Sequence, residues 1–121
     1  NIIKPPFNVN EVAQKAALES LKDDKFILRS VKHNDFYARK LKFFLQKYGI
    51  TSNEVSANFL LLNFEKCKFK AKNFNNKLKS KGIILRSTEE GYKIKNMLRL
   101  SIGSAKDNLR FMSAVKSIFN K

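Results

Sequence analysis

An arginine inside an apolar segment is the residue of this sequence best suited to binding chemistry. Between Met97 and Ser104, Arg99 alternates with three apolar residues, which are Leu98, Leu100 and Ile102. Because strand side chains alternate between two faces, the pattern predicts that the apolar residues face a core and Arg99 projects from the opposite face. A planar guanidinium suits a carboxylate or a phosphate, so an anion-binding role is one interpretation. The alternatives are a solvated sheet face and a structural ion pair.

The chain offers few other residues for catalysis or metal binding. It contains one cysteine and one histidine, which are too few for a disulfide framework or a usual zinc site. Cys67 repeats at helical spacing with Ala71, Phe74 and Leu78, which predicts a packing role for the thiol. His33 has no nucleophile or paired acid with it, so we expect it in a loop or on a helix surface.

The strong positive charge points first to nucleic acid as a partner. The chain has 25 Lys plus Arg against 10 Asp plus Glu, a net charge of +15. A nucleic-acid surface needs its charge on one face and exposed aromatic side chains. Here the basic residues are spread along the chain, and most Phe residues fall at positions expected to be buried. We therefore predict a solvated basic surface that binds nucleic acid only non-specifically, with a small nucleic-acid-binding module as the alternative.

Length and composition are typical of one small globular domain. The 121 residues, of which 43% are hydrophobic, suffice for a modest core. The sequence has no signal-peptide pattern and no apolar run of about 18 residues, so no membrane partner is expected. The single cysteine fits a reducing compartment, and the expected location is the cytoplasm.

The hydrophobic periodicity predicts a mixture of helices and strands. Helical spacing occurs at about residues 9–23, 25–48, 67–79 and 105–120. Strand patterns occur within residues 56–64, 83–86 and 97–102, and residues 87–96 are expected to form a loop or hairpin connection. This order favours an α+β fold, with a small antiparallel or mixed sheet of about three strands and helices packed on one face.

The apolar stripe of the first predicted helix consists mainly of small side chains. Its members are Val12, Ala13, Ala16, Ala17 and Leu21. Alanines permit close approach between helices, so we expect this stripe to pack tightly against another element. The preceding residues 1–8 contain Pro5-Pro6 and are expected to be an extended lead-in.

Four segments together resemble the histidinol-phosphate aminotransferases. They are Pro6–Asn10 followed by Ala13-Gln14, Ala57–Leu61, Lys81–Arg86 and Leu98–Gly103. The resemblance covers residues from about 5 to 119 and keeps the order of the family. It implies a pyridoxal-phosphate enzyme of the aspartate-aminotransferase fold, class I/II. It further implies amino transfer from glutamate to imidazole-acetol phosphate in histidine biosynthesis.

The resemblance also implies that the chain is only part of an enzyme. Residues 9–121 would be a C-terminal small domain, and residues 1–8 would lead in from a missing N-terminal large domain. That large domain would bind pyridoxal 5′-phosphate on a lysine, so the chain alone is expected to be inactive. Family members are homodimers. The alternatives are an aminotransferase of the same subgroup acting on aromatic amino acids, a phosphothreonine decarboxylase, and a scaffold without chemistry.

Two arginines then become candidate substrate-binding residues. Arg99 matches the strand arginine with which the family holds the carboxylate of glutamate or the phosphate of histidinol phosphate. Arg86 matches a family arginine near the substrate phosphate, and two guanidinium groups suit an anion that is close to doubly charged. The implied role of both is positioning and charge neutralisation. No catalytic, cofactor-binding or metal-binding residue is expected in this chain.

Overall fold

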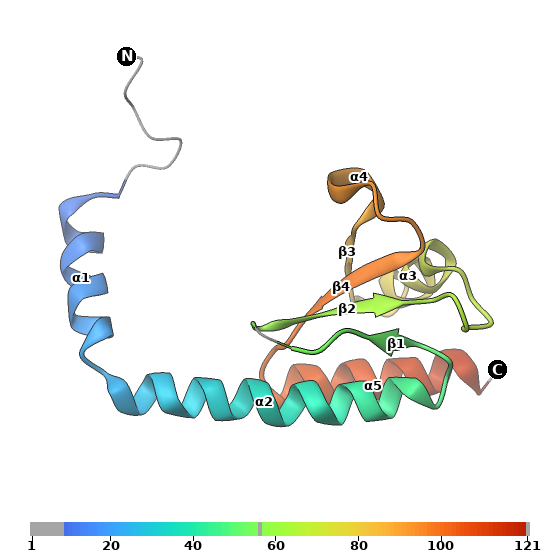
Figure 1. Ribbon diagram of the computed structural model, residues 1–121, viewed down its shortest axis with the longest axis horizontal. Helices are drawn as coiled ribbons and strands as arrows, with labels where there is room; N and C mark the ends of the chain where they lie inside the picture. Colours follow the sequence, from blue (N-terminus) through green and yellow to red (C-terminus); the bar gives the residue numbers. More distant parts are fainter. Residues whose placement is uncertain (1–8, 56, 121) are drawn as a thin grey trace, which may run out of the picture. The chain divides into compact units, whose positions relative to one another are not determined.

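The computed structural model describes residues 9–55 and 57–120, which form an α+β fold (Figure 1). The elements in chain order are α1 (Glu11–Leu21), α2 (Asp24–Gln46), β1 (Thr51–Ser52), β2 (Phe59–Asn63), α3 (Ala71–Lys79), β3 (Arg86–Ser87), α4 (Glu89–Tyr92), β4 (Met97–Ser101) and α5 (Ala105–Phe119). The chain divides into two compact units, residues 1–32 and 33–121. The lead-in predicted for residues 1–8 lies outside the described residues.

An antiparallel sheet is the centre of the second unit. Its strand order is β1-β2-β4-β3. In the central pair, Leu61 lies opposite Arg99 and Leu62 lies opposite Leu98. The predicted small sheet of about three strands is confirmed, and the described residues add one short strand, β1, to make four. Strand β1 has only two polar residues, so no apolar alternation marks it in the sequence.

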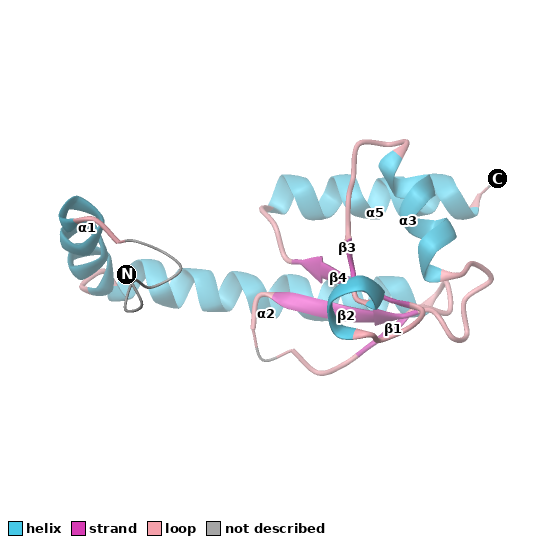
Figure 2. Ribbon diagram, turned by 90° about the horizontal axis from the view of Figure 1, so that it is seen from above, coloured by secondary structure: helices cyan, strands magenta, loops and turns pink. Residues whose placement is uncertain are grey.

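One face of the sheet is covered and holds the core. Four leucines of the two central strands are at most 5% exposed: Leu60, Leu62, Leu98 and Leu100. They form one hydrophobic cluster with buried side chains of α2, α3 and α5. Figure 1 shows α5 and the later part of α2 below the sheet, and Figure 2 shows that the two helices run along one another. The prediction of helices packed on one face is confirmed.

The predicted helices are present, with one change of position. The ends of α1, α2 and α5 differ from the predicted ends by at most two residues. Gly49 follows α2 with a φ of 73°, the left-handed conformation that glycine adopts readily after a helix. The helix predicted from Cys67 begins only at Ala71, whose N–H donates to the Asn96 side chain over 2.9 Å. Cys67 is half-buried and packs against the core, which confirms its packing role.

The connection between β3 and β4 is more ordered than expected. Instead of a plain loop, it contains the four-residue helix α4. Thr88 is 2% exposed, and its hydroxyl lies 2.8 Å from the carbonyl oxygen of Ile94 and 3.0 Å from that of Met97. Lys93 has a φ of 55° and ends the helix in the left-handed region. These contacts join residues six and nine positions apart, so helical or strand spacing does not reveal them.

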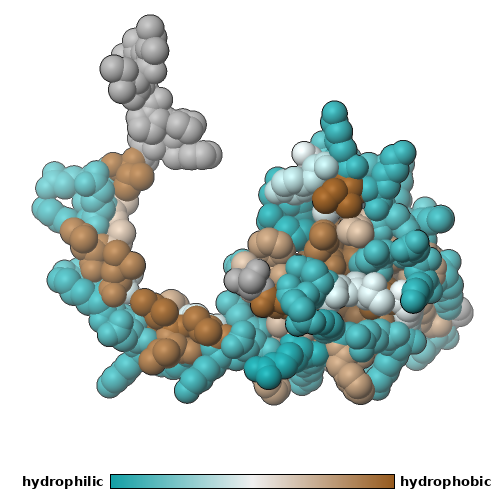
Figure 3. All heavy atoms as spheres, viewed as in Figure 1, coloured by the Kyte–Doolittle hydropathy of each residue, from teal (hydrophilic) through white to brown (hydrophobic). Residues whose placement is uncertain are grey.

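The first unit consists of α1 and the beginning of α2. Helix α1 begins after Asn10, whose side chain accepts a hydrogen bond of 2.8 Å from the N–H of Ala13. No residue of α1 is buried. The large apolar residues exposed in this unit, here called the N-terminal apolar surface, are Val9, Val12, Leu18, Leu21, Phe26, Ile27, Leu28 and Val31. Figure 3 shows them gathered over α1 and the first turns of α2.

The stripe predicted to pack against another element is thus exposed. Within α1, Val12 is 78% exposed and Leu21 is 70% exposed. A small protein rarely leaves a contiguous apolar surface of this kind open to water unless it is an interaction site. The tight packing expected of this helix is therefore not found among the described residues.

Candidate functional site

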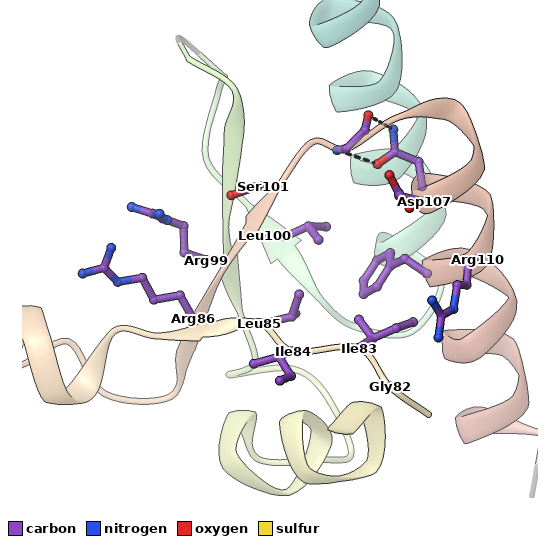
Figure 4. Close-up of a pocket in the computed structure, with 13 residues that line it drawn as sticks. Gly82, Ile83, Ile84, Leu85, Arg86, Arg99, Leu100, Ser101, Asp107 and Arg110 are labelled. Atoms are coloured by element: carbon purple, nitrogen blue, oxygen red, sulfur yellow. Dashed lines mark hydrogen bonds between the residues drawn. The ribbon is translucent and has the colours of Figure 1, made fainter. Parts of the chain in front are cut away.

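Arg86 and Arg99 lie next to each other on neighbouring strands. In the register of β3 and β4, Arg86 is the partner of Arg99. Side chains of directly opposed residues project to the same face of a sheet. Figure 4 shows both arginine side chains pointing away from α5, whereas Leu85 and Leu100 point toward it. The two residues singled out in the sequence are therefore together on the face of the sheet opposite to the core.

This open face is a mixed surface around the two guanidinium groups. By strand alternation and register, β2 contributes Phe59, Leu61 and Asn63 to it, and β4 contributes Met97, Arg99 and Ser101. Arg99 is half-buried in the middle of this surface, whereas Arg86 is exposed on an edge strand. The open face is therefore a basic and partly apolar surface.

Each arginine lies against an aromatic ring. The guanidinium carbon of Arg99 is 5.1 Å from the ring centroid of Phe59. That of Arg86 is 5.8 Å from the ring centroid of Tyr92, the last residue of α4. Both distances are within the range of a favourable cation–π contact. Sequence reasoning missed both rings, because the register brings Phe59 to Arg99 and the α4 turn brings Tyr92 to Arg86.

Neither arginine has an ionic partner in the described part of the chain. The ion pairs found there join Lys15 to Glu11, Lys22 to Glu19 and Lys42 to Glu54. The Nε of Arg99 is buried and has no hydrogen-bond partner among the described residues. A buried donor without a partner is costly and uncommon in folded proteins. The alternative of a structural ion pair for Arg99 therefore has no support among these residues.

Two buried asparagines hold the backbone on either side of the arginines. The Asn75 amide donates to the carbonyl oxygen of Leu85 over 3.0 Å and accepts from its N–H over 3.1 Å. In the same way, Asn108 donates to the carbonyl oxygen of Gly103 over 2.9 Å and accepts from its N–H over 3.1 Å. Each amide takes the place that a neighbouring strand would have. We call these two side chains the asparagine clamps.

Strand β3 begins later in the sequence than predicted. Residues 83–86 have the alternation of a strand, but pairing with β4 includes only Arg86 and Ser87. The preceding residues are tied to α3 instead. The N–H of Ile83 donates to the carbonyl oxygen of Leu78 over 3.0 Å, and both backbone polar groups of Leu85 bond to Asn75 on the strand edge that faces away from β4. The strand predicted at residues 83–86 was therefore wrong in its position.

His33 fixes the junction between β4 and α5. Its Nε2 is 2.9 Å from the carbonyl oxygen of Gly103, and its ring lies 4.7 Å from that of Tyr37. The residue is half-buried within α2. The imidazole therefore has a structural partner here, and it lies next to the clamp that Asn108 forms.

A pocket of about 360 Å³ separates residues 82–86 from the end of β4. Arg86 and Arg99 line one end of it, and Asp107 and Arg110 of α5 line another part. The hydroxyl of Ser104 donates to the Asp107 carboxylate over 2.6 Å, and the Ser104 N–H donates to it over 3.2 Å. These hydrogen bonds, the side-chain one first, hold the pKa of Asp107 below its ordinary value. The Asp107 N–H also donates to the Ser104 hydroxyl over 3.3 Å, and this bond and that of the Ser104 N–H form the capping box that begins α5.

The capping box makes the stability of α5 depend on pH. Because the pKa of Asp107 is lowered on folding, its contribution is present above the unfolded pKa of about 4 and is lost as the pH falls through the folded pKa. We expect Asp107→Asn to lower the free energy of unfolding at pH 7, and this difference to shrink below about pH 4. Urea denaturation of both proteins at several pH values measures it. A difference that does not change with pH would contradict this assignment.

The pocket next to the arginines does not by itself fit pyridoxal phosphate. That cofactor is bound as a Schiff base to a lysine, and the residues that line the pocket include no lysine. Among the described residues, no group of three His, Cys, Asp or Glu side chains is placed to hold a metal ion. No helix in residues 9–55 or 57–120 combines the length and apolar character required to cross a membrane.

Curated relatives identify the chain over nearly its full length. It is 66% identical over 120 residues to a histidinol-phosphate aminotransferase of Pelagibacter ubique, a match that covers 99% of this chain and 33% of that protein. It is 33% identical over 120 residues to histidinol-phosphate aminotransferase 1 of Mannheimia succiniciproducens, a match that covers 99% of this chain and 32% of that protein. The chain thus spans about a third of the length of the curated relatives it matches. No protein-family model matches it.

Solved structures show the same fold. The histidinol-phosphate aminotransferase of Clostridium acetobutylicum superposes with a TM-score of 0.83 at 24% identity, over 98% of this chain and 36% of that one. An aspartate aminotransferase of Thermotoga maritima superposes with a TM-score of 0.66 at 21% identity, over 93% of this chain and 29% of that one. The recognised family and the α+β fold are confirmed, and the nucleic-acid alternative is not favoured. By sequence, this chain is similar over nearly its full length to histidinol-phosphate aminotransferases, of which it spans about a third, and it shares their fold.

Proposed function

We propose that this chain is the substrate-anion-binding part of a pyridoxal-phosphate-dependent histidinol-phosphate aminotransferase. The whole enzyme transfers an amino group from glutamate to imidazole-acetol phosphate in histidine biosynthesis. The observation that carries the proposal is the pairing of Arg86 with Arg99 on the open face, without ion-pair partners among the described residues. The names of the relatives supply the substrate class.

Two guanidinium groups match the anions of this reaction. A carboxylate offers two oxygens and is satisfied by one planar fork, whereas a phosphate monoester offers three oxygens and more charge. Arg99 holds the side-chain carboxylate of glutamate or the phosphate of histidinol phosphate, and Arg86 joins it on the phosphate. One surface thereby serves both halves of the exchange. The arginines orient the substrate and neutralise its charge, and neither transfers a proton.

The cofactor belongs to the remainder of the longer protein. When bound, pyridoxal phosphate supplies the electron sink for amino transfer. Because no lysine lines the pocket beside the arginines, the chain needs the N-terminal large domain for activity. In this proposal residues 9–121 are the small domain and residues 1–8 lead in from the large one. The active enzyme is a homodimer in the cytoplasm, and the single cysteine fits a reducing compartment.

The N-terminal apolar surface supports the proposed missing domain. Its side chains are exposed, with values between 41% for Ile27 and 78% for Val12. Burial of one such side chain stabilises a protein by about 1.5–3 kcal/mol. The chain represents only a third of its relatives' length, so two thirds of such an enzyme are available to cover this surface. We assign the surface to contact with the large domain.

Amino transfer by the full-length enzyme tests the proposed function. The complete reading frame that contains residues 1–121 is expressed with pyridoxal phosphate and assayed with glutamate and imidazole-acetol phosphate. We expect turnover to histidinol phosphate, and little with aromatic 2-oxo acids. Preferred turnover of an aromatic 2-oxo acid, or decarboxylation of phosphothreonine, would contradict the substrate assignment.

A further inference from the structure

We propose that Phe59 and Tyr92 are positioning residues for the two arginines, and that Tyr92 acts only in the binding of phosphate. Each ring supports one guanidinium group, Phe59 that of Arg99 and Tyr92 that of Arg86. The inference rests on the proposed function of the arginines. In this inference the Phe59 ring serves the binding of every substrate anion, and the Tyr92 ring serves the binding of phosphate only.

The support of Arg99 is built into the centre of the sheet. Phe59 is the partner of Ser101 in the β2–β4 register, so its ring is on the face from which Arg99 projects two residues earlier. Phe59 and Arg99 are both half-buried, and the ring centroid is 5.1 Å from the guanidinium carbon. A long arginine side chain loses conformational freedom when it binds an anion. Stacking on a fixed ring removes part of that freedom beforehand.

The support of Arg86 comes from the connection between β3 and β4. Tyr92 ends α4 and is 55% exposed, and its ring centroid is 5.8 Å from the Arg86 guanidinium carbon. The buried Thr88 hydroxyl, with its two carbonyl partners, holds this connection in shape. Arg86 itself is exposed on a strand of two residues. Among the described residues its guanidinium group makes no hydrogen bond and no ion pair, so the Tyr92 ring is the support that the structure shows for it.

The different placement of the two supports implies different roles. Arg99 is central and half-buried, so it is in position before any substrate binds. A carboxylate needs one fork and binds to Arg99 alone, whereas a phosphate also recruits the exposed Arg86. Loss of the Phe59 ring therefore weakens the binding of both substrates. Loss of the Tyr92 ring weakens the binding of the phosphorylated substrate only.

Single-turnover half-reactions of the full-length enzyme separate the two roles. The absorbance of the cofactor reports an apparent dissociation constant for glutamate and another for histidinol phosphate. For Tyr92→Leu we expect binding of histidinol phosphate to weaken roughly fivefold, which equals about 1 kcal/mol, with glutamate unchanged. For Phe59→Leu we expect a similar weakening for both substrates. Tyr92→Phe and Phe59→Tyr keep an aromatic ring, and we expect both variants to bind the two substrates as the wild-type enzyme does. A loss of packing alone does not predict this difference between the aromatic and the leucine variants.

A matched control removes an aromatic ring elsewhere. Phe43 belongs to α2 and not to the strands that form the open face, it is 68% exposed, and its ring centroid is 5.2 Å from the Nζ of Lys47. Phe43→Leu is therefore expected to leave both dissociation constants unchanged. Equal weakening for both substrates in Tyr92→Leu, or no weakening for either, would overturn the selective role of Tyr92. Unchanged binding in Phe59→Leu would overturn the role of Phe59.

Arginine variants in the same assay distinguish this inference from the proposed function. If Arg99→Ala and Arg86→Ala bind both substrates normally, the arginines hold no substrate anion and the proposed function itself fails. If these variants bind weakly while the variants of Phe59 and Tyr92 bind normally, only the positioning role is wrong. The inference is upheld when both arginine variants and both leucine variants weaken binding in the pattern given above.

Discussion

Replacing Arg99 by alanine in the full-length enzyme is expected to weaken productive binding of histidinol phosphate by about 2–5 kcal/mol. The corresponding fall in kcat/KM is roughly 30-fold to several thousand-fold. In the proposed function, the substrate anion then loses the central guanidinium group, which is half-buried on the open face and whose Nε has no partner within the described residues. Steady-state kinetics with both substrates measure the effect. We expect glutamate to be affected as well.

A second arginine provides the control for this prediction. Arg110 of α5 lines another part of the same pocket and is exposed, and its side chain donates to the carbonyl oxygen of Lys81 over 3.3 Å. Arg110→Ala removes the same charge without touching the open face, so we expect less than a twofold change. Arg99→Lys keeps the charge but loses the planar fork, and an intermediate loss is expected. Normal turnover of Arg99→Ala would contradict the assignment.

Replacing Asn108 by alanine is expected to destabilise the end of β4 by about 2–3 kcal/mol. The Asn108 side chain is 3% exposed and bonds to both backbone polar groups of Gly103. Without it the N–H of Gly103 is left unsatisfied, while the carbonyl oxygen keeps its contact with His33. Hydrogen–deuterium exchange of a peptide that covers residues 97–103 measures the opening free energy. Faster exchange there is the expected result.

An exposed asparagine of α3 is the matched control for Asn108. Asn73 lies on the solvent side of that helix, and Asn73→Ala is expected to leave exchange of residues 97–103 unchanged. Because Arg99 projects from the same strand, Asn108→Ala should also lower kcat/KM for both substrates. Wild-type exchange rates in Asn108→Ala would show that the clamp does not hold the strand.

Local patterns in the sequence were enough to predict the helices and most of the strands, and which face of β4 is buried. Strand alternation in residues 97–102 correctly predicted a buried face and an opposite face with Arg99, because two-residue periodicity is a property of the extended backbone itself. Helical spacing likewise located α1, α2 and α5 to within two residues at each end. The family resemblance depended on short strings of residues, which need no knowledge of the fold.

Contacts between distant parts of the chain were decided only by the tertiary structure. The pairing of Arg86 with Arg99, the ring of Tyr92 beside Arg86 and the clamps from Asn75 and Asn108 all depend on packing between separate elements. Strand register and side-chain hydrogen bonds to backbone follow from which elements pack together, and no local period encodes them. The sequence by itself therefore determined the family, the elements and the face of Arg99. The tertiary structure decided which residues surround it, because those contacts exist only once the core has assembled.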